Sequence, residues 1–103
     1  DDRFQTWSIT LTGGESDLSR LGRLAHSKWR PPAGFRKEFT LPSGKRVDAI
    51  NFETREIIEL KPNNAKAIAK GQVQLRQYIA EAEREFGGKW TGYIQTYARG
   101  PGP

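Results

Sequence analysis

The stretch VDAINFETREIIELKP, residues 47–62, has the pattern of a β-hairpin but carries charges that a plain hairpin does not need. Two apolar runs rich in β-branched residues flank a polar pair, Glu53 and Thr54. If this pair forms the centre of a tight turn, Asp48 faces Glu59 across the two strands. The Cβ atoms of facing residues lie ~4.5–5.5 Å apart, so two carboxylates would repel each other unless a cation lay between them.

A divalent cation and a lysine would give this hairpin a chemical use. Mg²⁺ or Mn²⁺ suits Asp48 and Glu59 because hard cations prefer oxygen ligands. Side chains alternate along a strand, so Lys61 projects on the same side as Glu59. The metal would polarise a phosphate and help to form hydroxide, while the lysine would orient the water, which predicts phosphodiester hydrolysis. The alternative is a surface hairpin whose charges are only ion-paired across the strands.

The sequence on both sides of the hairpin predicts alternating helices and strands. Periodicity and turn residues predict a helix from Ser16 or Asp17 to about Trp29, strands over 35–41, 45–52 and 55–61, a helix over 65–86 capped by Asn63 or Asn64, and a strand over 89–97. The apolar face expected for the second helix consists of Ile68, Gln72, Leu75, Ile79, Ala82 and Phe86. A strand over 4–11 is optional, and the tail RGPGP is expected to be loose. The order after the optional strand is α-β-β-β-α-β.

Asp48 and the run Glu59-Leu60-Lys61, on adjacent strands within this order, resemble the motif of the PD-(D/E)XK nuclease superfamily. Val47 stands where the motif often has a proline. The resemblance covers about residues 16–97 and implies an α/β fold with a restriction-endonuclease-like α-β-β-β-α-β core, in which helices flank a mixed central sheet. It also implies a Mg²⁺- or Mn²⁺-dependent nuclease in which Asp48, Glu59 and Leu60 bind the metal and Asp48, Glu59 and Lys61 are catalytic.

Gln74 and Tyr78 in the second predicted helix match the Gln-x-x-x-Tyr motif of the RecB-type branch of these nucleases. Their i, i+4 spacing puts them on one stripe, beside the apolar face. The resemblance implies that both are catalytic residues that assist Lys61 and the phosphate. The alternative is an ordinary amphipathic helix in which Tyr78 is half-buried.

His26 closes a Gly-x-x-x-His pattern that begins at Gly22 in the first predicted helix. A histidine in this helix often joins the metal ligands in the RecB-type branch, so the resemblance implies the same role for His26. A surface or packing role is the alternative. Glu15 or Asp17 could then supply the additional ligand.

The charge is distributed unevenly along the chain, whose formal net charge is +5. Residues 18–46 contain eight basic residues and one acid, whereas residues 47–103 contain eight basic residues and seven acids. A basic first half favours a phosphate-binding face, and a solvated basic surface is the alternative. The residues expected to contact nucleic acid are Arg23, Lys28, Arg30, Lys45 and Arg46. Trp29 and Trp90 are expected to be structural rather than to stack on bases.

Composition excludes several other classes of protein. The 103 residues, of which 35% are hydrophobic and 28% charged, predict one folded domain over 1–103. The absence of cysteine excludes disulfides, thiolate metal sites and cysteine nucleophiles. No apolar run is long enough to cross a membrane. Methionine is absent even from position 1, which suggests a piece of a longer polypeptide.

These features together predict a small nuclease domain that acts on DNA rather than RNA. By analogy it resembles the carboxy-terminal toxin domain of a bacterial polymorphic toxin, delivered into the cytoplasm of a target cell and neutralised by an immunity protein. The alternatives are a tRNA-cleaving RNase of the same fold, a non-catalytic nucleic-acid-binding module and a pure interaction domain. The sequence leaves open endonuclease or exonuclease action, sequence preference, oligomeric state and the identity of the inhibitor.

Overall fold

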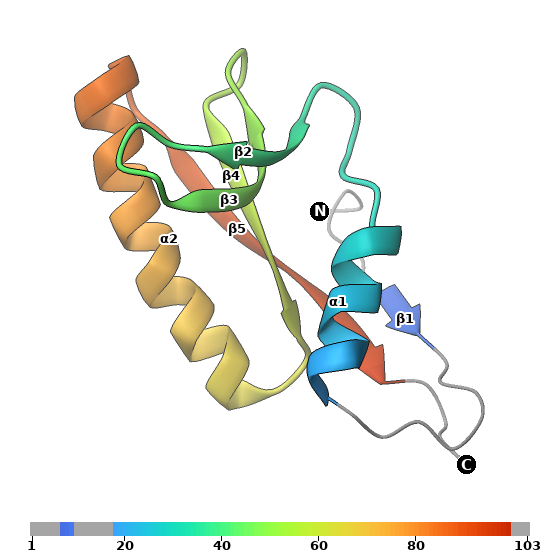
Figure 1. The fold of residues 1–103 in the computed structure, drawn as a ribbon. Coiled ribbons are helices and arrows are strands. Elements are labelled where there is room, and N and C mark those ends of the chain that lie inside the picture. Colours follow the sequence, from blue (N-terminus) through green and yellow to red (C-terminus); the bar gives the residue numbers. More distant parts are fainter. Residues whose placement is uncertain (1–6, 10–17, 100–103) are drawn as a thin grey trace.

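The computed structural model describes residues 7–9 and 18–99, which form a mixed sheet and two helices (Figure 1). The elements in chain order are β1 (Trp7–Ile9), α1 (Leu18–Lys28), β2 (Arg36–Thr40), β3 (Arg46–Asn51), β4 (Glu56–Pro62), α2 (Ala65–Phe86) and β5 (Thr91–Arg99). The sheet has the strand order β1-β5-β4-β3-β2. β5 is parallel to both β1 and β4, whereas β3 is antiparallel to both β2 and β4.

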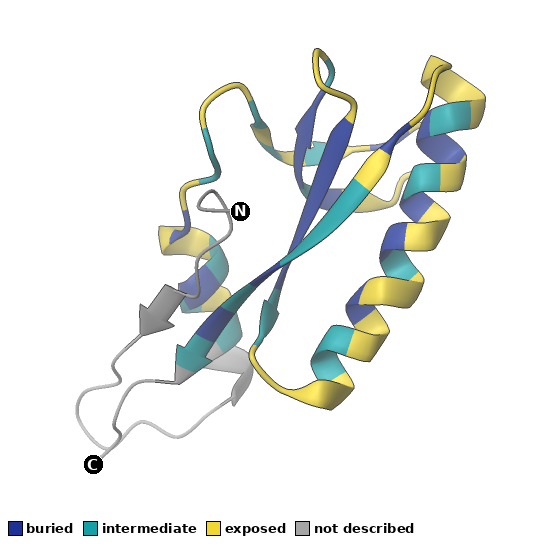
Figure 2. Cartoon of the chain, turned by 180° about the vertical axis from the view of Figure 1, so that it is seen from behind, coloured by how far each residue is buried: buried dark blue, intermediate teal, exposed yellow. Residues whose placement is uncertain are grey.

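The two helices pack against opposite faces of this sheet. Alternate residues of a strand point to opposite faces. Accordingly, Ile57 belongs to a buried cluster with Leu75 and Ala82 of α2, and Ile58 belongs to a second cluster with Ala25 of α1. Figure 2 shows long buried stretches on the central strands and buried positions along α2. Because these strands are covered on both faces, each charged side chain among them needs a partner.

The predicted α-β-β-β-α-β order is confirmed, and the ends of its elements differ from the predicted ones by two residues at most where they are described. The optional first strand spans only Trp7–Ile9 in the described residues. The predicted caps of α1, Ser16 and Asp17, and residues 100–103 of the tail lie outside the described residues. Within the part of the chain that is described, no helix is long and apolar enough to cross a membrane.

α2 begins and ends where its flanking residues predict. The Asn64 side chain accepts a hydrogen bond from the Ala67 N–H at 2.8 Å, which is the expected N-cap contact. Gly87 ends the helix with a φ of 76°, in the left-handed region that glycine adopts readily. The predicted bounds, residues 65–86, are therefore correct.

The buried face of α2 is rotated from the predicted one. Leu75 and Ala82 are buried as expected, but Phe86 is 38% exposed. The buried residues are Gly71, Leu75, Tyr78, Glu81 and Ala82. Glu81 is buried because it accepts hydrogen bonds from the backbone N–H and the hydroxyl of Ser43, each at 2.7 Å. This contact with the turn between β2 and β3 cannot be read from helical periodicity.

β3 and β4 are paired over only part of their length. The pairs run from Asn51↔Glu56 to Ala49↔Ile58, in the register predicted for a turn centred on residues 53 and 54. The pairing stops there, whereas β4 stays paired with β5 as far as its last residue. We call the place where the two strands separate the fork; it consists of Asp48 on β3 and Glu59, Leu60 and Lys61 on β4.

β2 is irregular opposite the fork. Its residues pair with β3 on either side of Glu38, so Glu38 lies opposite Asp48. Glu38 has a φ of 55°, a conformation that residues other than glycine rarely adopt. Its two neighbours face different helices: Lys37 donates to carbonyls at the end of α1, and Phe39 packs in the cluster under α2. In a regular strand these two neighbours would point to the same face of the sheet. The left-handed conformation of Glu38 therefore moves the side chains that follow it in β2 to the opposite face.

Candidate active site

Two carboxylates replace the backbone pairing at the fork. The Glu59 Oε1 atom accepts a hydrogen bond from the Asp48 N–H at 2.9 Å, and the Asp48 Oδ2 atom accepts one from the Leu60 N–H at 2.7 Å. Each acid therefore binds the backbone of the opposite strand. The structure brings Asp48 and Glu59 together as the register predicts, but through these crossed bonds rather than as a pair in the ladder.

Burial and repulsion both act on Glu59. The residue is 4% exposed, and burial, followed by the charge of Asp48, raises its pKa to about 8. The Asp48 N–H, Lys61 and His26 act in the opposite direction. Burial and the neighbouring carboxylate therefore favour the protonated form of Glu59, and a cation near the two carboxyls would favour the ionised form.

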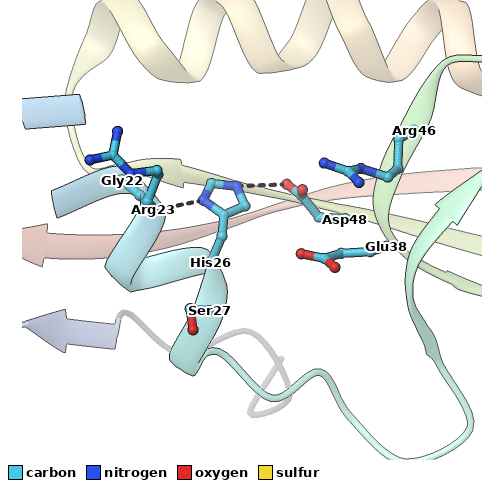
Figure 3. A pocket seen from close by; sticks show the side chains of 7 residues that line it. All are labelled: Gly22, Arg23, His26, Ser27, Glu38, Arg46 and Asp48. Atoms are coloured by element: carbon cyan, nitrogen blue, oxygen red, sulfur yellow. Dashed lines mark hydrogen bonds and ion pairs between the residues drawn. The ribbon is translucent and has the colours of Figure 1, made fainter. Parts of the chain in front are cut away.

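His26 connects α1 to the fork. Its Nδ1 atom lies 2.9 Å from the Gly22 carbonyl oxygen, and its Nε2 atom lies 3.3 Å from Asp48 Oδ2 (Figure 3). Both partners are acceptors, and the hydrogen bond to Asp48 raises the pKa of His26 above its ordinary value. The structure thus places His26 beside Asp48 as an ion-pair partner. Gly22 fixes the ring through its carbonyl, one helical turn earlier.

Tyr97 of β5 belongs to this site, although the sequence did not indicate it. Its ring packs edge-on against His26, with centroids 6.5 Å apart and an interplanar angle of 78°. A Cβ atom at Gly22 would lie 3.5 Å from the Tyr97 hydroxyl, an ordinary van der Waals contact, so this hydroxyl lies against α1. Burial, and then the charge of Asp48, raises the pKa of Tyr97. An aromatic residue in an apolar strand is typical of a core position, so no sequence signal distinguishes it.

Lys61 and Tyr78 lie on the α2 side of the fork, and Gln74 lies on α2 between Gly71 and Tyr78. Lys61 is half-buried against Gly71. Tyr78 is 8% exposed, deeper in the core than the predicted position beside the apolar face, and burial followed by the charges of the two fork acids raises its pKa. The Gln74 Oε1 atom is buried and has no hydrogen-bond partner among the described residues. A buried acceptor without a donor is costly, so this atom is suited to a donor brought by a ligand or by a moving side chain.

An open pocket of about 540 Å³ lies on the α1 side of the fork (Figure 3). It is lined by Gly22, Arg23, His26, Ser27, Glu38, Arg46 and Asp48. In Figure 3, the Arg46 side chain extends toward Asp48, whereas the Arg23 side chain, on the other side of the pair formed by His26 and Asp48, points away from it. Guanidinium groups are suited to bind phosphate, and Arg46 is the one that extends over the pair. Glu38, which was not among the predicted site residues, reaches the pocket through its left-handed backbone, and no residue pattern signals that conformation.

The other basic residues with a predicted role lie outside the pocket lining. The Arg30 Nη1 atom donates to three carbonyls at the end of α1, at 3.1 to 3.4 Å, so this guanidinium caps the helix. Lys28 and Lys45 are exposed. Trp29 and Trp90 are 5% and 6% exposed, in agreement with the structural role expected of them.

The potential metal ligands at and beside the fork are of the types that bind a hard divalent cation. Asp48 and Glu59 offer carboxylate oxygens, Leu60 its backbone carbonyl, and His26 an imidazole. Within the described ranges no three side chains of His, Cys, Asp or Glu are gathered closely enough to hold a metal ion. One or two carboxylates together with substrate phosphates commonly bind Mg²⁺, so the two fork carboxyls are compatible in kind with such an ion. Glu15 and Asp17, the alternative ligands, lie outside the described residues.

Comparison with known proteins places these features in a family. A family model described as restriction endonuclease fold toxin 9 matches residues 14–97, a range that includes the fork, His26, Gln74 and Tyr78. No curated protein and no solved structure matches the chain. The order of helix, three strands, helix and strand agrees with a restriction-endonuclease-like fold. Because the match spans most of the chain, it shows that the protein belongs to the family of restriction endonuclease fold toxins.

Proposed function

We propose that this chain is a Mg²⁺- or Mn²⁺-dependent nuclease that hydrolyses phosphodiester bonds in DNA. The observation that carries the proposal is the fork, where two carboxyls cross onto each other's strand beside Lys61. Family membership supports a nuclease toxin, and restriction endonuclease folds typically use divalent metals.

The fork residues would hold the cation. Asp48, Glu59 and the Leu60 carbonyl are the proposed ligands, with His26 joining them or orienting Asp48. When bound, a divalent ion supplies Lewis-acid polarisation of a phosphate oxygen. The hydrogen bonds from the Asp48 and Leu60 N–H groups support this role, because they fix both carboxyls before any ligand arrives and so reduce the reorganisation that catalysis would require.

The remaining residues would act on the water and the phosphate. Lys61 is proposed to orient the attacking water and to donate a hydrogen bond to the phosphate oxygens on which negative charge develops. Gln74 is proposed to accept a hydrogen bond from the Lys61 ammonium through its unpartnered Oε1 atom. Tyr78 is proposed to donate a hydrogen bond from its hydroxyl group to a phosphate oxygen. Arg23 and Arg46 are the proposed phosphate contacts at the pocket.

Three basic side chains outside the pocket would extend this contact along the nucleic acid: Lys28, Arg30 and Lys45. Such contacts supply affinity without reading the sequence. As a toxin, the domain is proposed to be delivered into the cytoplasm of a target cell. A cognate immunity protein is proposed to protect the cell that makes it.

The test is to incubate the purified domain with plasmid DNA and with total RNA, each in Mg²⁺, in Mn²⁺ and in EDTA. An Asp48→Asn variant prepared in the same way is the control for contaminating nucleases. We expect cleavage of DNA in either metal, and none in EDTA or by the variant. Cleavage of RNA alone would replace DNase by RNase, and binding without cleavage would indicate a non-catalytic module. Intact nucleic acid in every lane would refute the proposal.

A further inference from the structure

Gly71 lies at a position of α2 where helix formation alone does not favour glycine. It is in the interior of the helix Ala65–Phe86 and is buried against the sheet. Glycine is the poorest helix former after proline, and a buried helix position would ordinarily use a larger side chain. A packing reason is therefore to be expected at this position.

The space that Gly71 leaves open is occupied by Lys61 and Ile94. A Cβ atom built on Gly71 would lie 2.8 Å from Ile94 Cδ1, 3.0 Å from Lys61 Cγ and 3.3 Å from Lys61 Cε. The lysine side chain therefore runs along the bare backbone of α2 from its second carbon to its last. The Lys61 backbone is fixed by its pairing with Thr96 of β5, so only the rotamers of the side chain remain to be set.

We propose that Gly71 is a positioning residue for Lys61. The missing side chain of Gly71 leaves the space along which the Lys61 side chain extends toward the carboxyls of the fork. A free lysine has many rotamers, and contact with the α2 backbone selects among them before substrate binds. The kinetic part of this inference rests on the proposed role of Lys61 in cleavage. It does not depend on whether the substrate is DNA or RNA.

The two neighbours of Gly71 would respond differently to an added methyl group. Ile94 Cδ1 is the far end of a flexible side chain and can rotate away. Lys61 Cγ is close to the root of its side chain, so a small displacement there moves the ammonium group by a larger distance. Misplacement of a reacting group by about 1 Å can reduce a rate ~100-fold. Gly71→Ala should therefore impair catalysis more than folding.

Gly92 of β5 offers a matched control. A Cβ atom there would lie 2.9 Å from both Ile79 Cδ1 and Leu75 Cδ2, which are side chains of α2. Gly92→Ala thus crowds the same contact between α2 and the sheet with the same methyl group, but without touching Lys61.

The experiment compares kcat, KM and melting temperature for the parent, Gly71→Ala and Gly92→Ala. We expect Gly71→Ala to lower kcat about 10- to 100-fold, with little change in KM. Gly92→Ala should lower the melting temperature while its folded fraction keeps the parent kcat. In a Lys61→Ala background, Gly71→Ala should cause no further loss, because the side chain that it displaces is absent. Parent-like cleavage by Gly71→Ala, or an equal further loss in that background, would overturn the inference.

A second variant protects the test from a failure to fold. Ile94→Val deletes the Cδ1 atom that makes the closest contact, so the double variant Gly71→Ala/Ile94→Val keeps only the collision with Lys61. It should fold and remain slow, while Ile94→Val alone should cleave like the parent. A fast double variant would contradict the role of Gly71.

A readout that does not need cleavage separates this inference from the proposed function. The Lys61 amino group can be labelled by reductive ¹³C-methylation, and its NMR signal identified by its loss in Lys61→Ala. This signal should shift in Gly71→Ala and stay in place in Gly92→Ala. If the parent does not cleave nucleic acid, the proposed function fails but the signal still tests the geometry. An unmoved signal in Gly71→Ala would refute the positioning role.

Discussion

The two ends of the β3–β4 hairpin use the same pair of strands in opposite ways. At the turn end, which comprises residues 49–58, the strands are joined by backbone pairs, and Ile57 and Ile58 are fully buried. The Asn51 side chain also accepts the N–H groups of Glu53 and Thr54 in the turn. At the fork the pairing is replaced by bonds from two carboxyls.

The aromatic residues strengthen this contrast. Phe52, in the turn, packs edge-on against Phe39, Phe86 and Trp90, with ring centroids 5.1 to 5.7 Å apart. The fork has instead a raised carboxyl pKa and a left-handed residue opposite it. Packing at the turn end therefore offsets the free-energy cost of holding reactive groups close together at the fork.

Removing the charge of Asp48 should have the largest effect. Asp48→Asn keeps an oxygen that can accept the Leu60 N–H, so its melting temperature should stay near that of the parent, while cleavage falls roughly 1000-fold or more. Asp48→Ala should lose the same activity and also about 1–3 kcal/mol of stability, because the Leu60 N–H is left without an acceptor. Plasmid cleavage and thermal unfolding measure the two quantities. Equal stability of the two variants would show that the crossed bonds do not hold the fork.

Lys61→Ala should impair turnover while leaving the proposed metal ligands intact. We expect kcat to fall about 100- to 1000-fold, since one donor to the developing charge is lost. Affinity for Mn²⁺, measured by calorimetry, should remain within a few-fold of the parent. A large loss of Mn²⁺ affinity would mean that Lys61 supports the carboxyls instead of the reaction.

Ile57→Ala and Gln74→Ala should separate stability from activity. Ile57 is fully buried at the turn end, so its truncation should cost ~2–5 kcal/mol while the folded fraction keeps the parent rate. Gln74→Ala removes a buried oxygen that lacks a partner, so its stability should not fall, but activity should fall about 10- to 100-fold if a hydrogen bond to a charged group is lost. Denaturant titrations and rates per folded molecule test both. Cleavage by Gln74→Ala at the parent rate would remove Gln74 from the site.

The stability of the metal-free protein should fall as pH rises across the titration of Glu59. The pKa of this carboxyl is about 8 in the folded state against an ordinary value of 4.5, so between these values the folded state binds more protons than the unfolded one. His26 acts in the same direction, since its raised pKa gives stability that is present below pH 6.5 and lost as pH rises through the folded pKa. Glu59→Gln should reduce the dependence while keeping an acceptor for the Asp48 N–H. Urea unfolding in EDTA at several pH values measures how the free energy of unfolding depends on pH. If this dependence is the same in Glu59→Gln as in the parent, Glu59 is not its cause.

The smallest effect is expected at Glu38. Glu38→Gly should raise the stability by up to about 1 kcal/mol, because a left-handed residue other than glycine costs ~1–2 kcal/mol and the greater freedom of unfolded glycine offsets part of the gain. Arg55, with a φ of 57° at the turn end, is the matched position, and Arg55→Gly relieves the same backbone cost. If Glu38→Gly destabilises the protein while Arg55→Gly does not, side-chain contacts hold Glu38 in place.

The fold was predictable where the relevant information is local. Strand periodicity, the turn at residues 53 and 54 and the cap at Asn64 specify the hairpin and α2, and together they give the element order. The rotation of α2 was not predictable, because the burial of Glu81 depends on Ser43 in a distant turn. Periodicity ranks residues by polarity and therefore excluded Glu81 from the buried face.

The site was predictable only as far as the hairpin register reaches. The register brings Asp48 and Glu59 together, but it does not reveal that pairing ends there or that each acid binds the opposite backbone. Glu38 and Tyr97 were missed because one depends on a single unusual φ and the other on packing between β5 and α1. Both are properties of the assembled molecule rather than of a residue pattern.

The pairing of β4 also determines when the fork can form during synthesis. Beyond the last pair with β3, the backbone pairs of β4 are made with β5, with Glu59 opposite Ile94 and Lys61 opposite Thr96, and the crossed bonds of the two acids join β4 to β3. A nascent chain that has not yet reached residue 94 contains both side chains but lacks the strand that pairs with their backbone. The fork therefore gains its backbone support only after α1, the hairpin and α2 have all been made, and a chain that stops before β5 has only the crossed bonds of Asp48 and Glu59 to hold it.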